Sequence, residues 1–263
     1  PFLSAPVDKT NHWGSNTYNV FKELSKDSKT GISMTQTYEY FREPQSDPPW
    51  KDSVDGFERV TANLPADYVE CFSFVTPIIE MPIYLTWLTD WYDKLGGESD
   101  QRTISDFSEF PKGFDLVINC TGLDSGSLLG DEEVYPIRGQ ILRVKTDIKE
   151  MHLDQQIPTL AYIVPRSNDM ILGGVAQQNN WSLEPTEEDR KFILQKCSLI
   201  IPELKDQDII EELVGLRPGR SSVRLDKEII SGRPLIHNYG HGGSGITLSW
   251  GCADEVVELA NGR

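Results

Sequence analysis

The length, composition and charge of the chain exclude several classes of protein. It has 263 residues, of which 38 % are hydrophobic and 25 % are charged, as in an ordinary globular protein with room for two modest domains or one large α/β unit. A formal net charge of −16 argues against nucleic acid or an anionic membrane as a partner, because both require clustered Lys and Arg. No apolar run approaches the roughly 20 residues of a transmembrane helix.

The cysteines and histidines do not suggest a metal site. The four cysteines are Cys71, Cys120, Cys197 and Cys252. They have no CxxC or CxxH spacing, which suits a reducing compartment better than a disulfide framework. His237 and His241 are four residues apart, but glycines lie between them and no third ligand is near. We therefore expect a protein without a bound metal.

The first half of the chain predicts two helices and a strand. Residues 15–26 are predicted to form a helix, and residues 82–95 a second one that begins at Pro82 and stops at Gly96. The buried stripe of this second helix is expected to consist of Ile83, Trp87, Leu88, Trp91 and Leu95. Residues 114–122, "FDLVINCTG", predict a buried strand that meets a glycine turn.

The second half mixes hairpins with strand–helix units. The predicted elements are a strand over 135–145, a hairpin over 160–177 with its turn at 166–169, a helix over 185–200, strands over 209–218 and 234–239, and a final helix. Thr186 and Asp189 form a capping-box arrangement, and the helix they open is expected to bury Ile193, Cys197 and Ile200. This order favours a mixed α/β protein with two interleaved domains.

A cluster of glycines separates the last predicted strand from the last helix. Gly240, Gly242, Gly243 and Gly245 are costly to order, so the segment is expected to need positive φ or a close approach of its backbone to another group. Glycines that run into a helix also expose N–H groups at the positive end of the helix dipole, which favours an anionic or electron-rich ligand. The alternative is a tight, closely packed strand–helix connection.

The end of the strand predicted over residues 114–122 is a further candidate for a site. Thr121 and Gly122 follow an apolar strand, at the edge where open α/β sheets bind ligands, although an ordinary strand exit is an equal alternative.

Three arginines stand close together in a very acidic protein. They are Arg217, Arg220 and Arg224. The guanidinium fork suits a carboxylate, while pairing with Glu211 and Glu212 is the simpler explanation for any one of them. Tyr162 could supply a phenol to a site, or be a half-buried core residue.

Together these segments resemble the D-amino-acid oxidase family of flavoenzymes, which includes D-aspartate oxidase. The matching pieces are "PWKDSVDGF", "YLTWLTDWYDKLGG", "FDLVINCTGLDSGSL", "YPIRGQILRV", "YIVPRSNDMILGG", "NNW", "VGLRPGRSSVRLDKE" and "IHNYGHGGSGITLSWGCADE". The resemblance implies an FAD enzyme that oxidises D-amino acids to imino acids, which hydrolyse to 2-oxo acids and ammonia, while O₂ becomes hydrogen peroxide. It implies hydride transfer to flavin N5 without an obligatory side-chain base, so that the protein mainly orients its substrate.

The resemblance also implies an organisation. It predicts an α/β protein in which a Rossmann-like FAD-binding domain, residues 83–137 and 225–263, is interleaved with a substrate domain, residues 1–82 and 138–224, built on a mixed or antiparallel sheet. The GxGxxG strand–helix unit of the family is absent from the sequence, so the chain as given is expected to bind FAD poorly; a truncated member that binds no FAD and is not catalytic is the alternative. The family implies a peroxisomal location, although the chain ends in "NGR" rather than a targeting tripeptide, with the cytoplasm otherwise, and a homodimer as a further possibility.

Individual residues match positions of known role in the family. Arg217 matches the arginine that binds the substrate carboxylate, Tyr162 a tyrosine whose hydroxyl contacts it, and Gly243 the glycine whose carbonyl receives the amino group. The positions that match FAD contacts are Ile104, Thr121, Gly122, His241, Gly242, Gly243, Gly245, Ile246 and Thr247. Pro158 stands where the family has a second active-site tyrosine, which leaves the lid of the site open to question.

The substrate's side chain is expected to be neutral. An acidic D-amino acid needs a second cation, because burying an unpaired charge is costly. Ala176 occupies one position where D-aspartate oxidases carry an arginine, and the residues just before Tyr162 contain neither Arg nor Lys. Arg166, in the predicted turn, is a possible substitute, so an enzyme for acidic substrates remains the alternative.

Overall fold

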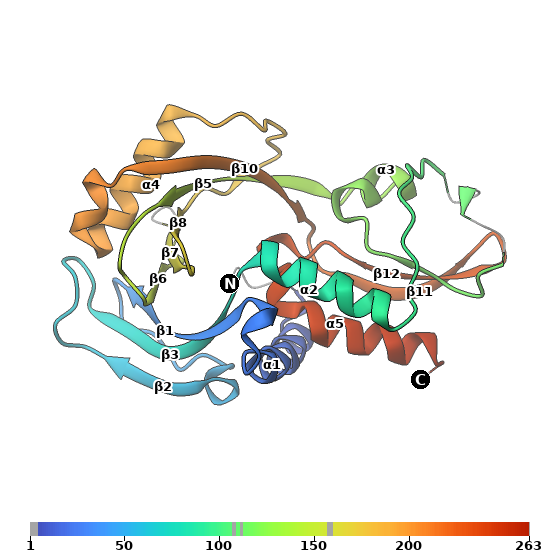
Figure 1. Ribbon diagram of the computed structural model, residues 1–263, viewed down its shortest axis with the longest axis horizontal. Helices are drawn as coiled ribbons and strands as arrows, with labels where there is room; N and C mark the ends of the chain where they lie inside the picture. The colour runs from blue at the N-terminus through green and yellow to red at the C-terminus, as the bar shows by residue number, and fades with distance from the viewer. Residues whose placement is uncertain (1–4, 107–108, 111–112, 157–159, 263) are drawn as a thin grey trace. The chain divides into compact units, whose positions relative to one another are not determined.

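The computed structural model describes all residues except 1–4, 107–108, 111–112, 157–159 and 263. The chain divides into two compact units, and both are discontinuous in sequence. Unit 1 comprises residues 1–17, 86–137 and 217–263, and unit 2 comprises residues 18–85 and 138–216. Each unit is therefore assembled from segments that are far apart along the chain (Figure 1). No helix in the described part of the chain is both long and apolar enough to span a membrane.

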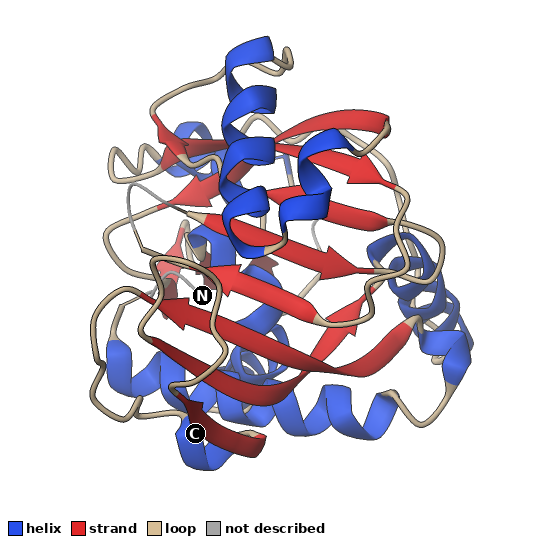
Figure 2. Cartoon of the chain, turned by 90° about the vertical axis from the view of Figure 1, so that its left-hand side faces the viewer, coloured by secondary structure: helices blue, strands red, loops and turns tan. Residues whose placement is uncertain are grey.

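Unit 2 is built on a nine-stranded mixed sheet. Its strands are β1 (Ile32–Phe41), β2 (Asp55–Val60), β3 (Glu70–Ile79), β5 (Tyr135–Val144), β6 (Met151–Asp154), β7 (Ala161–Pro165), β8 (Met170–Gly173), β9 (Gln177–Gln178) and β10 (Ile209–Gly219). Their order is β10-β5-β8-β7-β6-β1-β3-β2, with β9 paired to β5. Strand β1 pairs antiparallel with β3 and parallel with β6, so the sheet is mixed, as expected (Figure 2).

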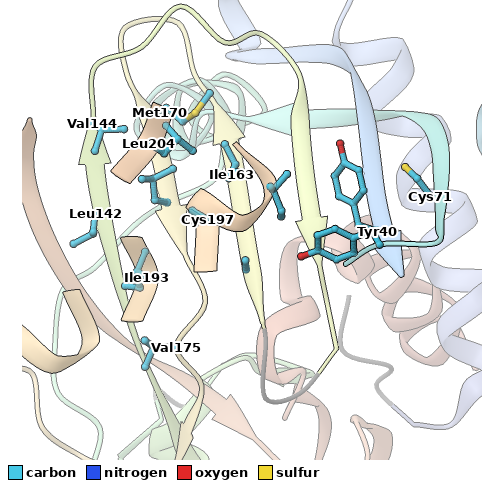
Figure 3. Packing of buried hydrophobic residues seen from close by; sticks show 14 residues of the cluster. Tyr40, Cys71, Leu142, Val144, Ile163, Met170, Val175, Ile193, Cys197 and Leu204 are labelled. Atoms are coloured by element: carbon cyan, nitrogen blue, oxygen red, sulfur yellow. The ribbon is translucent and has the colours of Figure 1, made fainter. Parts of the chain in front are cut away.

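Helix α4 (Glu187–Ile200) covers the main core of unit 2. Its Thr186 cap accepts a hydrogen bond from the backbone N–H of Asp189 at 3.2 Å, which confirms the predicted helix start. Ile193 and Cys197 of the helix are fully buried beside strand residues such as Ile163 (Figure 3). The buried face of this helix was predictable because its apolar residues recur with helical spacing.

The hairpin over residues 160–177 is also confirmed. Strands β7 and β8 pair antiparallel, with Pro165 opposite Met170. Between them, the backbone N–H of Arg166 donates to the carbonyl of Asp169 at 2.9 Å, which closes the predicted turn.

Helix α1 (Val7–Leu24) begins eight residues before the predicted start. Gly14 and the polar residues around it obscured the helical pattern, but Trp13 is 1 % exposed and belongs to a core cluster. The indole N–H of Trp13 donates to Glu255 at 2.8 Å, so a tertiary contact supports this first part of the helix.

Helix α2 (Met81–Lys94) contradicts its predicted stripe. Within the described residues it buries Tyr84, whereas Ile83, Trp91 and Leu95 are exposed and the other two members of the stripe are partly buried. Periodicity identifies residues on one helix face, but only tertiary packing determines whether that face is covered. Trp91 instead contacts Trp87 and Trp250, with ring centroids 5.2 and 6.0 Å apart.

Unit 1 contains parts of α1 and α2, a three-stranded sheet and two further helices among its described residues. The strands and the further helices are β11 (Arg224–Ile230), β12 (Arg233–Tyr239), β4 (Val117–Asn119), α3 (Ser125–Leu129) and α5 (Gly245–Ala260). Strand β12 pairs antiparallel with β11 and parallel with β4.

Short 3₁₀ turns occur in both units. They lie at Ser28–Thr30, Lys51–Ser53 and Pro202–Asp206 in unit 2, and at Gly122–Asp124 and Gly242–Ser244 in unit 1.

The predicted buried strand over residues 114–122 is wrong in its length and burial. Only Val117–Asn119 form β4, while Phe114 is 64 % and Ile118 47 % exposed. Among the described strands β4 pairs with β12 alone and lies at an edge, so its apolar residues are not enclosed.

Candidate functional site: two glycine turns at one sheet edge

Two glycine-containing turns leave the same edge of the unit 1 sheet. Strands β4 and β12 are parallel, and Asn119 lies opposite His237 in their register. Each strand then enters a 3₁₀ turn, at Gly122–Asp124 and Gly242–Ser244, that leads directly into a helix. The predicted cofactor positions on the two turns are thus brought together at the carboxyl edge of parallel strands, where α/β sheets bind ligands.

The glycines of these turns are needed for the backbone path. Gly122, Gly240 and Gly242 have φ of +60°, +82° and +56°, a region that side-chain-bearing residues rarely adopt. At Gly240 a Cβ atom would also lie 2.8 Å from the Cβ of Arg220. Positive φ and close approach, the two reasons expected from the sequence, therefore both apply.

The start of helix α5 is partly exposed. The side chain of its N-cap residue, Ser244, makes no capping hydrogen bond, and the first turn has no acidic residue. Gly243, Ile246 and Thr247 are exposed around this start. The start of a helix is the positive end of its dipole, so this partly exposed helix start suits an anionic or electron-rich group.

The buried Asn119 stabilises the first turn through hydrogen bonds of its side chain. The Oδ1 atom of Asn119 accepts hydrogen bonds from the backbone N–H and the hydroxyl of Thr121, at 3.1 and 2.8 Å. Its Nδ2 lies 3.3 Å from the hydroxyl of Ser125, which in turn is 2.8 Å from that of Thr121. Asn119 was not predicted as a functional residue, although an asparagine two residues before a turn residue is a recognised turn signal.

His237 connects this hydrogen-bond network to Glu228, whose side chain is partly exposed at the surface. It is fully buried, with Nε2 2.6 Å from Glu228 and Nδ1 3.4 Å from Nδ2 of Asn119. Because Asn119 uses its oxygen for Thr121, its amide group donates to Nδ1, and Nε2 carries the proton toward the carboxylate. Burial lowers the pKa of His237, and the hydrogen bond from His237 lowers the pKa of Glu228.

The partly buried His241 contacts the buried Cys252. The two side chains are 3.6 Å apart, between Nε2 and Sγ. Burial lowers the pKa of His241 to about 4 and raises that of Cys252 to about 12. The neutral imidazole of His241 therefore accepts a hydrogen bond from the protonated thiol of Cys252. Within the described residues, no group of three potential metal ligands is present.

The segment that carries Arg217 runs beside both turns. A Cβ at Gly122 would lie 3.8 Å from Pro218, and one at Gly242 would lie 3.9 Å from Ile137. Ile137 also borders Gly219, two residues after Arg217. The end of β10, which contains the partly buried Arg217, thereby lies at the sheet edge that carries the turns.

The other arginines of this segment hold carboxylates of unit 1. Arg220 pairs with Asp131 and Glu133, and Arg224 pairs with Asp226 and Glu228. The local acids that the sequence suggested as partners are engaged elsewhere: Glu211 pairs with Arg143, and Glu212 with Arg190.

The remaining predicted site residues lie as follows. Ile104 is partly exposed and outside any helix or strand, and Gly245 begins α5. Tyr162 belongs to β7 of unit 2, where it lies opposite Gly173. Arg166 forms hydrogen bonds from Nε and Nη2 to the two carboxylate oxygens of Asp169, both at 2.5 Å. Pro158 lies outside the described residues.

Comparison with known proteins identifies the family. The family model described as "FAD dependent oxidoreductase" matches residues 21–259. The chain is 42 % identical to a D-amino-acid oxidase of Rubrobacter xylanophilus, over 99 % of this chain and 81 % of that protein. It is 35 % identical to a D-aspartate oxidase of Homo sapiens, over 99 % of this chain and 80 % of that protein. The fold is similar to that of glycine oxidase from Geobacillus kaustophilus, with a TM-score of 0.77 at 15 % identity over 99 % of this chain and 80 % of that one.

The fold and the family model define an FAD-dependent oxidoreductase of mixed α/β architecture. The chain belongs to the FAD-dependent oxidoreductase family, in its D-amino-acid oxidase branch, and its cofactor is FAD. The expected family, fold class and cofactor are thus confirmed. The residues present fit this cofactor, because two positive-φ glycine turns and the partly exposed start of α5, which has no acidic residue in its first turn, lie at one sheet edge.

Proposed function

We propose that this protein oxidises neutral D-amino acids. The overall reaction converts the amino acid, O₂ and water into a 2-oxo acid, ammonia and hydrogen peroxide. When bound, FAD would accept a hydride, that is two electrons and a proton, from the Cα–H bond, and the electrons would then reduce O₂ to hydrogen peroxide. The observation that carries the proposal is the position of Arg217, which lies on the strand end that borders both glycine turns.

The protein's own residues would bind and orient the substrate. Arg217 is assigned to the substrate carboxylate, because its planar fork donates two parallel hydrogen bonds. Tyr162 is assigned a hydroxyl contact with the same carboxylate, and the carbonyl of Gly243 accepts from the amino group. The family resemblance supports these three roles, and the exposure of Gly243 is compatible with its own. Orientation of this kind is the main contribution that a protein makes to such chemistry.

FAD itself is assigned to the sheet edge of unit 1. In this proposal the turns at Thr121 and His241 lie against the cofactor, the start of α5 faces its electron-rich groups, and Ile104 lines it. Unit 1 is then the part that holds FAD, and unit 2 the substrate domain. This assignment differs from the expected boundaries for residues 1–17, 83–85 and 217–224. Residues 1–17 cluster with unit 1 because Trp13 packs against α5.

The surroundings of Arg166 support a neutral substrate. Both oxygens of Asp169 accept hydrogen bonds from Arg166, and Asp169 also pairs with Arg143. These guanidinium groups lower the pKa of the Asp169 carboxyl. An arginine whose charge is compensated in this way is poorly suited to a substrate carboxylate, and Ala176 offers no charge.

A substrate panel tests the proposal. Protein loaded with FAD should release hydrogen peroxide with D-alanine and D-proline and be inactive with their L-enantiomers, and its kcat/KM for D-aspartate should be at least tenfold lower. A preference for D-aspartate would favour the alternative of an acidic-substrate oxidase, which the similarity to the human D-aspartate oxidase keeps open. FAD-loaded protein with no peroxide formation from any D-amino acid would contradict the proposed reaction. The peroxisomal location and the homodimer implied by the resemblance stay predictions.

A further inference from the structure

Tyr162 has a glycine as its direct neighbour in the sheet. In the register of unit 2, Tyr162 of β7 lies opposite Gly173 of β8, and Ile141 of β5 lies opposite Gly173 on the other side. Side chains directly opposite one another on adjacent strands share a face and normally touch. Gly173 therefore leaves a gap in the row of side chains beside the phenol.

The ring of Tyr162 fills that gap. A Cβ atom at Gly173 would overlap Cζ, Cε2 and Oη of Tyr162, each closer than the 3.0 Å that real Cβ atoms keep. The phenol thus lies across the backbone of Gly173, with its hydroxyl end over the glycine. Any larger residue at this position would have to displace the ring.

Backbone conformation does not explain this glycine. Gly173 is not among the glycines with positive φ, and it ends a regular antiparallel strand. A glycine within a strand is unfavourable because it loses more entropy than other residues and packs no side chain. Its presence is explained by the space that the phenol of Tyr162 occupies.

The backbone below the ring is held from the other face of the sheet. The thiol of Cys197 lies 3.8 Å from the carbonyl oxygen of Tyr162 and 3.7 Å from that of Gly173. Cys197 is completely buried, in the core between α4 and the strands. A clash at position 173 would consequently be relieved by rotation of the tyrosine side chain rather than by separation of the strands.

We infer that Gly173 is a positioning residue, which determines where the hydroxyl of Tyr162 is presented to the substrate carboxylate. This inference rests on the proposed function, because it gives Tyr162 its carboxylate role. Gly173 itself contacts no substrate in this account and acts through the ring. It should therefore affect substrate binding more than the chemical step.

The test is a double-mutant cycle in the FAD-loaded protein. We expect Gly173→Ala to raise the KM for D-alanine about tenfold and to change kcat by less than about threefold. In the Tyr162→Phe background, which keeps the ring but lacks the hydroxyl, the same substitution should change KM by less than about twofold. Gly215→Ala is the matched control, because Gly215 lies in a strand of the same unit and a Cβ there would have no neighbour within 4 Å.

An equally large effect of Gly173→Ala on KM in both backgrounds would overturn the inference. If Gly173→Ala proves too unstable to assay, its urea midpoint is compared in the wild-type and Tyr162→Ala backgrounds. Loss of stability that disappears when the ring is removed supports the contact, and loss that persists shows that the glycine serves the backbone and overturns the inference. Failure of the proposed function is distinguishable, because the wild-type protein itself would then form no peroxide from D-amino acids.

Discussion

At the scale of single residues, the arginines of the molecule differ in their surroundings. Arg220 and Arg224 hold carboxylates of the protein, whereas Glu211 and Glu212, the acids that precede Arg217 in the sequence, pair with other arginines. The motif around Arg217 was visible in the sequence. The partners of Arg220 lie far along the chain, in residues 131 and 133, whereas Arg224 pairs with acids of its own strand. Sequence proximity was thus a good guide to the ion pairs of Arg224 and a poor one for Arg220, whose partners meet it only through the fold.

Replacement of Arg217 tests the proposed carboxylate contact. We expect Arg217→Leu to raise the KM for D-alanine roughly 100-fold, because a charge-assisted hydrogen-bonding group contributes up to about 3 kcal/mol. FAD binding, measured by flavin fluorescence quenching, should be nearly unchanged. Arg102→Leu, which removes the same charge from an exposed pair with Asp100, serves as the control. A KM within twofold of wild type would remove Arg217 from this role.

At the scale of the elements, the junction of α5 with α1 shows how backbone contact replaces side-chain packing. Gly251 of α5 lies against the backbone of Trp13, and its N–H donates to the hydroxyl of Thr17 at 3.0 Å. The helix itself was predicted from its apolar spacing. That one of its glycines is required by a neighbouring helix could not be predicted, because no local pattern marks the point where two backbones meet.

Two glycines on these helices should respond in opposite ways to the same substitution. Alanine normally stabilises a helix relative to glycine by about 1 kcal/mol. At Gly251 a Cβ would overlap the backbone of Trp13, so Gly251→Ala should lower the free energy of unfolding by about 1–3 kcal/mol. At Gly14 the nearest atom, in Leu248, would be 3.8 Å from the new Cβ, and Gly14→Ala should be neutral or stabilising. Urea denaturation measures both, and equal effects would contradict the contact.

At the scale of the whole molecule, each unit holds at least one buried or partly buried histidine whose pKa is lowered. Burial lowers the pKa of His152 in unit 2 to about 4, as it does for His241 in unit 1, and His237 is shifted in the same direction. His152 lies between polar and aromatic groups, 3.0 Å from the hydroxyl of Tyr40 and stacked with Tyr38. The fold thus contains several bases that bind a proton more readily when the chain is unfolded.

Stability should therefore fall as the pH decreases from about 6.5 to about 4. In this window the unfolded histidines, with a pKa near 6.5, are protonated while the buried ones are not, so each contributes a loss of up to about 1.4 kcal/mol per pH unit. Above the unfolded pKa the contribution is fully present. Urea unfolding at pH 7, 6 and 5 measures the slope. His152→Gln should lower the slope by about one bound proton, and equal slopes for wild type and His152→Gln would refute this account.

The sequence by itself determined the family, the mixed α/β class, the cofactor and the main elements whose pattern is local. The capped helix α4, the hairpin β7–β8 and the glycine turns before α5 follow from capping residues, alternation and glycine density, which depend on neighbours along the chain. Tertiary structure alone decided which apolar faces are covered, since the stripe of α2 and the residues of β4 are more exposed than their patterns predict. It also decided that Asn119 supports the first turn and that Gly173 makes room for Tyr162, because both depend on which strands lie side by side.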